Sequence, residues 1–279
     1  MLRLIATVAL AALAAPASAQ SVAVGVEIAR DRFAYRFENP SSFDTAELVP
    51  HYFEQTYVAD NLWLVASAHY TAGIPWETSG GATFERTLPA TDYDTFVDPD
   101  GTVIVAGTSG DAVIRSIRIS QRGDLGRAGP VGFAAGYSLR YDRANFLVGH
   151  KTVTVDGSVV QAYDVTDPET TSSLIQEFFF GVSAARRLGS GWRMMVAGDA
   201  APATTGRLAI DLPAKYPGTT FVFVATSFTG SGHVVFTRVG RRRPLDLAMD
   251  VEHAWGYSSG SSLSRSRLSL RLSVDLRPR

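Results

Sequence analysis

The chain contains no cysteine and only two lysines, Lys151 and Lys215. Without cysteine it can form neither a disulfide scaffold nor a thiolate metal site. The chain also lacks an excess of either charge, because it has 26 Lys and Arg residues and 27 Asp and Glu residues. Such a balance excludes nucleic-acid binding through bulk charge. We therefore expect no nucleic-acid partner, no cofactor and no metal.

Long apolar runs are scarce, and the clearest one lies within residues 1–19. Arg3 precedes an apolar run from Leu4 to Ala15, and Ala17-Ser18-Ala19 follows before Gln20. The run is shorter than the roughly 20 residues that a membrane-spanning helix needs. This pattern predicts a cleaved secretory signal peptide at 1–19 and a single mature domain at 20–279.

Strict alternation of apolar and polar residues is the strongest signal in the mature chain. It predicts β-strands, each with one apolar face and one small or charged face. The clearest apolar series are Leu268, Leu270, Leu272, Val274 and Leu276; Leu245, Leu247, Met249, Val251 and Trp255; and Val131, Phe133, Ala135, Tyr137, Leu139 and Tyr141. With weaker stretches elsewhere, the chain contains about ten strands.

Alternation alone is compatible with a secreted β-sandwich as well as with a membrane barrel. Connection lengths favour the barrel, because outer-membrane barrels have short periplasmic turns and long extracellular loops. Short turns are expected at 72–75, 123–129, 188–191 and 240–244, and long loops at 39–46, 86–101, 147–172, 200–219 and 256–264.

The predicted fold is all-β, a ten-stranded antiparallel transmembrane β-barrel. It would lie in the outer membrane of a Gram-negative-type bacterium, in contact with outer-membrane lipid or lipopolysaccharide. The termini would be periplasmic and the loops extracellular.

In this fold the polar strand faces line the lumen, where opposite charges on adjacent strands can pair. The expected lumenal charges are Arg118, Arg140, Glu177, Asp250, Glu252, Arg267, Arg271 and Asp275. Aromatic residues near strand ends predict girdles at the lipid headgroups. They are Trp63, Trp76, Trp192, Trp255, Tyr70, Tyr141 and Tyr257.

The order of these elements resembles that of the omptins, ten-stranded outer-membrane endopeptidases. The stretch from Phe133 to Tyr141 is similar to the omptin fifth strand, and the stretch from Glu252 to Trp255 is similar to the ninth. Thr91-Asp92-Tyr93-Asp94-Thr95 falls where omptins carry an Asp-x-Asp pair. The resemblance implies that Asp92 and Asp94 are catalytic residues that position a water molecule, opposite an Asp-x-His pair in the fourth loop.

The second half of that site is missing from the sequence. The fourth loop, 200–219, contains Asp211 but no histidine. The five histidines are His51, His69, His150, His233 and His253, and of these only His150 falls in a predicted outer loop. It belongs to the third loop, so it could act only if that loop folded over the barrel mouth.

Other interpretations of the aspartates remain open. Asp92 and Asp94 fit a solvated loop that caps its own turns, and together with Asp98 and Asp100 they could supply calcium ligands. We favour a non-proteolytic surface protein whose loops bind an extracellular peptide or protein or serve a structural role. The alternatives are an omptin-type endopeptidase that uses Asp92 and Asp94, and a small pore.

Overall fold

The structure is a computed structural model that describes nine segments of the chain. They are residues 19–38, 52–70, 75–83, 87–165, 169–189, 191–211, 217–238, 245–256 and 261–276. No helix within these segments is long and apolar enough to cross a membrane. The predicted signal peptide lies outside the described residues, apart from Ala19.

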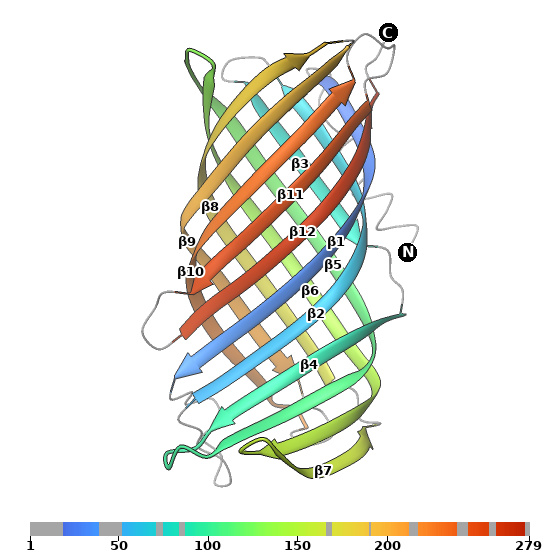
Figure 1. Cartoon of the computed structure of the whole chain (residues 1–279), viewed down its shortest axis with the longest axis vertical. Helices are drawn as coiled ribbons and strands as arrows, with labels where there is room; N and C mark the ends of the chain where they lie inside the picture. Colours follow the sequence, from blue (N-terminus) through green and yellow to red (C-terminus); the bar gives the residue numbers. More distant parts are fainter. Residues whose placement is uncertain are drawn as a thin grey trace.

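Strands make up nearly all of the described chain (Figure 1). They are β1 (Ala19–Glu38), β2 (Tyr52–Tyr70), β3 (Trp76–Thr83), β4 (Thr87–Val97), β5 (Val103–Ala128), β6 (Val131–Val155), β7 (Ser158–Val165), β8 (Glu169–Leu188), β9 (Trp192–Asp211), β10 (Thr220–Arg238), β11 (Leu245–Gly256) and β12 (Ser261–Asp275).

These strands close into an antiparallel ring. Each long strand pairs with the next, and β1 pairs with β12 to complete the circle. β3 and β4 both pair with β2 on one side and β5 on the other, so together they form one position in the ring. β7 extends β6 as a hairpin outside the ring. The predicted ten-stranded antiparallel barrel is confirmed.

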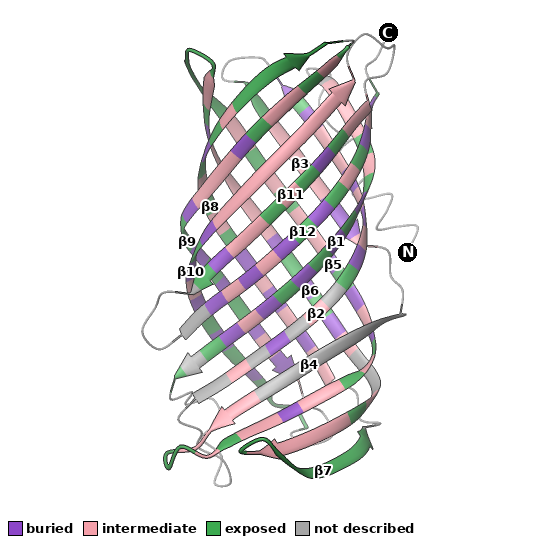
Figure 2. Ribbon diagram, viewed as in Figure 1, coloured by how far each residue is buried: buried purple, intermediate pink, exposed green. Residues whose placement is uncertain are grey.

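The side-chain alternation has the predicted direction. The outward residues Leu270, Met249 and Phe133 are 57%, 43% and 42% exposed, whereas Arg267 is 4% exposed and faces the lumen. Figure 2 shows buried and exposed residues alternating along the strands. Because large apolar side chains cover the outside and charges line the inside, the barrel is built to sit in lipid.

The two ends of the barrel differ. We call the end where β1 begins and β12 ends the terminal end, and the opposite end, drawn at the bottom of Figure 1 with β7, the distal end. At the terminal end β5 and β6 meet at a tight turn, Gly129–Pro130, so the predicted turn at 123–129 is largely strand.

The distal strands are longer than predicted. Residues 86–101 were expected to form a loop, but β4 occupies most of this range and a turn at Asp98–Gly101 follows it. Within 147–172, β6 continues to Val155 and β7 follows. The two strands are joined by Asp156 and Gly157, both with positive φ, the two-residue hairpin that an Asp-Gly pair favours.

Candidate functional site

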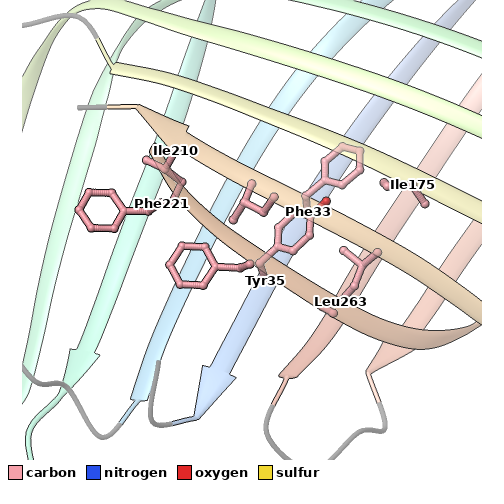
Figure 3. Packing of buried hydrophobic residues seen from close by; sticks show 9 residues of the cluster. Phe33, Tyr35, Ile175, Ile210, Phe221 and Leu263 are labelled. Carbon is pink, nitrogen blue, oxygen red and sulfur yellow. The ribbon is translucent and has the colours of Figure 1, made fainter. Parts of the chain in front are cut away.

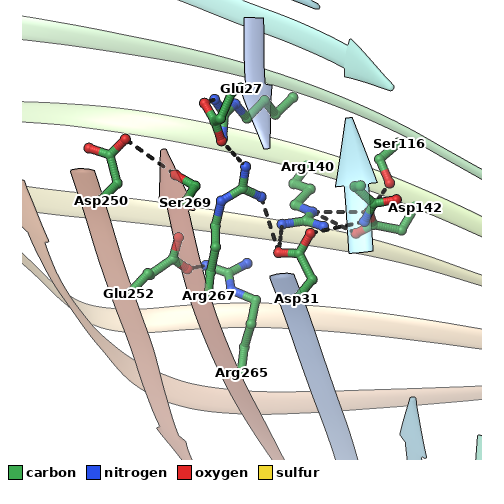
Figure 4. Close-up of polar contacts among 12 residues, drawn as sticks. Glu27, Asp31, Ser116, Arg140, Asp142, Asp250, Glu252, Arg265, Arg267 and Ser269 are labelled. Carbon is green, nitrogen blue, oxygen red and sulfur yellow. Dashed lines mark hydrogen bonds and ion pairs between the residues drawn. The ribbon is translucent and has the colours of Figure 1, made fainter. Parts of the chain in front are cut away.

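A layer of charged side chains crosses the lumen near its middle (Figure 4). Glu27 and Asp31 of β1 have fully buried side chains. Arg118 Nη2 of β5 lies 2.5 Å from Glu27 Oε2, and Arg140 Nη1 of β6 lies 3.0 Å from Asp31 Oδ1. Since β1 and β6 are not neighbours in the ring, these ion pairs bridge the interior.

Arg267 of β12 joins the two halves of this layer. Its Nη2 atom contacts Glu27, and its Nη1 atom lies 3.1 Å from Asp31 Oδ1. Three guanidinium groups lie within 4.9–5.2 Å of the Trp63 ring centroid, those of Arg118, Arg140 and Arg267. Trp63 is completely buried in the lumen, so its predicted place in an aromatic girdle is wrong. Packing against cations inside the barrel holds this ring away from lipid.

A second charged group lies nearer the distal end. Arg265 of β12 contacts Glu252 of β11, and its Nη2 atom lies 2.6 Å from Glu177 Oε1 of β8. The Ser138 hydroxyl donates to Glu177 at 2.8 Å. The predicted lumenal network is therefore confirmed, but its central acids, Glu27 and Asp31, were missed. Their strand alternates only weakly in the sequence.

An apolar cluster lies in the lumen on the distal side of the charged layer (Figure 3). Its members come from five strands, and Phe96 of β4 packs against them. They are Phe33, Tyr35, Ile175, Leu208, Ile210, Phe221, Phe223, Ala225 and Leu263. This cluster and the charged layer thus lie one after the other along the lumen.

His233 lies in the lumen toward the terminal end. Its Nδ1 atom is 2.7 Å from Asp250 Oδ1, and its Nε2 atom is 3.1 Å from Asp199 Oδ2. Arg122 of β5 contacts both oxygens of Asp199, at 2.6 and 2.8 Å. A carboxylate thus lies beside each ring nitrogen, and Ser231 Oγ also lies 3.1 Å from Nε2. Through these contacts His233, which belongs to β10, connects Asp199 of β9 with Asp250 of β11.

The predicted catalytic aspartates lie in β4. The backbone of Asp92 pairs with Tyr57 of β2 and that of Asp94 with Gln55, while their side chains lie outside what the structure describes. Alternation puts positions 92 and 94 on the same face of β4 as Phe96, which packs into the lumenal apolar cluster. These positions therefore belong to the lumenal face at the distal end.

His150 is on the other side of the wall. It pairs with Ser109 of β5 and with Asp164 of β7, and its Nδ1 atom lies 3.1 Å from Asp164 Oδ1. The side chains of His150 and Asp164 are 55% and 85% exposed. Directly paired residues share a face, and Ser109 pairs with Thr91 rather than with Asp92. His150 thus faces outward, away from positions 92 and 94.

The remaining histidines do not complete the site either. His69 Nδ1 lies 3.7 Å from Glu77 Oε2 near the terminal end, and His253 Nδ1 lies 2.8 Å from Ser266 Oγ on the outer wall. His51 lies outside the described residues. Among the residues that the structure describes, no histidine faces the lumen at the distal end.

The candidate calcium ligands are divided between a strand and a turn. The Thr102 amide donates to Asp100 Oδ1 at 3.0 Å, and this backbone hydrogen bond lowers the pKa of the Asp100 carboxyl. Gly101 closes the turn by donating to the Asp98 carbonyl. No group of three or more potential metal ligands occurs in the described segments. The turn is stabilised by its own hydrogen bonds.

The fold is similar to that of known outer-membrane proteins, although the sequence is not. No protein-family model matches the chain, and no curated protein matches its sequence. Among solved structures, the outer membrane protease OmpT from Escherichia coli is similar, with a TM-score of 0.67 at 7% identity over 92% of this chain and 97% of OmpT. The translocator domain of the autotransporter NalP from Neisseria meningitidis is more distant, with a TM-score of 0.39 at 8% identity over 99% and 95% of the two chains. The chain has the omptin-like outer-membrane barrel fold.

Proposed function

We propose that this outer-membrane β-barrel is not a protease and has a closed lumen. Its distal end would lie outside the cell and bind a peptide or protein there. The lipid-facing belt would contact outer-membrane lipid, and lipopolysaccharide in the outer leaflet. The observation that carries the proposal is the position of His150 on the outer face of β6, whereas positions 92 and 94 are on the lumenal face of β4.

Hydrolysis through an activated water needs a base within hydrogen-bond reach of that water. A histidine on the opposite side of the sheet cannot reach a water held at positions 92 and 94, because the wall of the barrel separates them. The exposed β6–β7 hairpin, by contrast, suits contact with a partner outside the cell.

The test for proteolysis is incubation of the lipid-reconstituted protein with a dibasic fluorogenic peptide. We expect no cleavage by the wild type. Cleavage that Asp92→Ala abolishes and Asp100→Ala leaves intact would contradict the proposal. Asp100 is the matched control because it is an exposed aspartate at the same end of the barrel.

The orientation can be tested with single cysteines, since the chain has none of its own. Val159→Cys at the distal end and Arg187→Cys at the terminal end both replace exposed residues. On intact cells we expect a membrane-impermeant maleimide to label position 159 and not position 187. The reverse pattern would invert the proposed orientation.

The second candidate is an omptin-type endopeptidase that uses Asp92 and Asp94 with an unidentified base. The OmpT-like fold and the lumenal register of these two positions favour it. A small pore is the third possibility, and the ion pairs across the lumen argue against it.

A further inference from the structure

The β6–β7 hairpin leaves one edge of β7 without a neighbouring strand. Among the strands that the structure describes, β7 pairs only with β6 and stands last in the order of the sheet. The hairpin lies at the distal end of the molecule, and β7 is farther from the barrel than β6 (Figure 1). An edge strand presents a row of backbone N–H and C=O groups that can pair with another chain.

The hydrogen bonds of the hairpin show which backbone groups of β7 point away from β6. The Asp156 amide donates to the Val103 carbonyl at 2.9 Å, so these two residues form a hydrogen-bonded pair that continues the β5–β6 ladder. Such pairs alternate with non-bonded pairs along an antiparallel ladder, so the backbone groups of Thr152 also point to β5. Its partner on β7 is Ala162, whose own N–H and C=O groups therefore point away from β6, and Asp164 repeats this arrangement. The free edge thus offers the backbone groups of both residues.

The hairpin is fixed to the barrel wall before any partner binds. The Val103 amide donates to Asp156 Oδ1 at 3.0 Å, in addition to the backbone bond between the same two residues. Asp156 and Gly157 both have positive φ and form a tight two-residue turn. A strand held in this way loses little conformational freedom when another strand pairs with it.

β7 exposes apolar side chains beyond the lipid-facing belt. Val159 and Val160 are 64% and 60% exposed. On the outer face of β6 the apolar series ends at Tyr141, because Arg143 follows it on the same face. The chain from Tyr141 to His150 spans about 30 Å of strand, which is about 20 Å along the membrane normal in a tilted strand. Lipid tails therefore do not reach β7, and its apolar surface is open to a partner in water.

β7 also lacks features by which edge strands commonly avoid pairing. Its sequence, Ser-Val-Val-Gln-Ala-Tyr-Asp-Val, contains neither proline nor lysine. Valine and tyrosine favour strands. A bulge at Val160 interrupts the edge, but pairing with β6 is regular from Gln161 to Val165. This regular part is close to the usual strand length of about five residues.

The surroundings of β7 are acidic. We call β4, residues 103–111, residues 149–155, β7 and the turns between them the distal sheet. Four of its aspartates are exposed: Asp100, Asp111, Asp156 and Asp164. The sequence of these segments contains one lysine, Lys151, and neither arginine nor glutamate. Its charge therefore repels an acidic partner and attracts a basic one.

We propose that the free edge of β7 binds an extended, positively charged segment of another protein as an added β-strand. Backbone hydrogen bonds to Ala162 and Asp164 would hold the segment, the exposed valines would contact its side chains, and the aspartates would select its charge. A second copy in the same membrane cannot supply this strand, because the edge points away from the bilayer (Figure 1). The inference rests on the proposed function, since it names the surface that contacts a peptide or protein outside the cell.

Fluorescence anisotropy with the protein in lipid nanodiscs tests the proposal at about 50 mM salt, where charges are weakly screened. The probe is a labelled peptide of alternating lysine and valine that is as long as β7, and we expect saturable binding. The same peptide with every backbone nitrogen methylated keeps the charge but loses the backbone donors, and a peptide of alternating glutamate and valine reverses the charge. Each should bind at least about tenfold more weakly. Equal binding of the methylated peptide would overturn the proposal, because charge alone would then explain the affinity.

A pair of proline variants tests the position of the site. Ala162→Pro removes an N–H that points to the free edge and leaves the bonds to β6, an arrangement that edge strands tolerate. It should weaken binding of the lysine–valine peptide by about tenfold or more. Thr219→Pro is the control, because it places a proline at an exposed position just before β10 at the same end of the barrel, and it should bind as the wild type does. Heat-modifiable gel mobility checks that both variants form the barrel, and an unchanged affinity of Ala162→Pro would overturn the proposal.

Self-association and the proposed function are tested separately. Light scattering in detergent measures the oligomeric state, and a dimer that Ala162→Pro dissociates would overturn the proposal in favour of a second copy at the edge. Peptide binding that persists in Ala162→Pro would place the peptide elsewhere at the distal end and leave the proposed function standing. Cleavage of the dibasic peptide or inverted cysteine labelling would contradict the proposed function, whereas the affinity measured in nanodiscs depends on neither result.

Discussion

The stability of this barrel should depend strongly on single buried charges. Asp31 has no exposed side-chain surface and lies between Arg140 and Arg267, and the Asn61 amide donates to its other oxygen at 3.1 Å. A buried ion pair of this kind adds little to the stability of the fold compared with apolar residues of similar volume. Removing one partner, however, leaves the others buried without compensation.

Asp31→Asn should therefore lower the free energy of unfolding by about 3–5 kcal/mol. Asp60→Asn is the control, because the Asp60 side chain is 65% exposed and 4.0 Å from Arg30. We expect its effect to stay within about 0.5 kcal/mol. Urea unfolding in lipid vesicles, followed by heat-modifiable gel mobility, measures both. Equal effects would show that burial does not make the charged layer sensitive to the loss of one partner.

The lack of a side chain at Gly181 leaves room for Asp199 and Arg122 to contact each other. A Cβ at Gly181 would collide with Asp199 Oδ1 and with Arg122 Nη2, whereas a Cβ at Gly198 would have its nearest neighbour at an ordinary 3.6 Å. Gly181→Ala should cost about 1–3 kcal/mol in the same unfolding experiment, and Gly198→Ala much less. A neutral Gly181→Ala would mean that the Arg122–Asp199 pair rearranges freely.

At the scale of the strand, β12 shows how one element serves two environments. Its outward leucines contact the membrane, while Arg265 and Arg267 on its inner face bind carboxylates from β1, β8 and β11. A strand can do this because its side chains alternate between faces. The same strand pairs with both β11 and β1, so it also closes the barrel.

A charge introduced on the outer face should destabilise the barrel by an amount that depends on its position along the strand. Leu270→Arg, in the belt, should destabilise the barrel by about 2–4 kcal/mol, and Ser264→Arg, on the same face nearer the distal end, by about 0–1 kcal/mol. Unfolding in lipid vesicles measures the difference. If both substitutions cost the same, the apolar belt does not extend over Leu270.

At the scale of the whole molecule, two sets of packed side chains lie one after the other along the lumen. The charged layer crosses the lumen through ion pairs between strands that are not neighbours, and the apolar cluster lies on its distal side. A ten-stranded ring encloses little more than packed side chains, and open porins use 16 or more strands. The closed lumen that we propose would therefore follow from barrel size as well as from side-chain chemistry.

The protein should show no steady conductance in planar bilayers. Asp31→Asn should remain silent as well, because the apolar cluster does not depend on that charge. A general porin serves as the positive control for the bilayer. Steady current through the wild type would contradict the closed lumen and favour the small-pore alternative.

The local sequence determined which face of each strand meets lipid. Alternation along β6, β11 and β12 is a property of neighbouring residues, so it could be recognised without the fold, and most lumenal charges followed from it. The strand count and antiparallel arrangement also followed, because turns and strands are local features. The partners in each ion pair could not be predicted from this alternation. Glu27 and Arg118 are far apart in the chain, and only ring closure brings them together.

Only the tertiary structure decided whether His150 lies on the same side of the barrel wall as positions 92 and 94. Up to Ala144, the even-numbered residues of β6 face the lumen, and by that count His150 would face it too. The register between β5 and β6 shifts after Asp111, so that Leu147 has no partner on β5 and His150 turns outward. A bulge of one residue reverses every later side chain. Whether one forms depends on pairing between strands, which no single strand's sequence reveals.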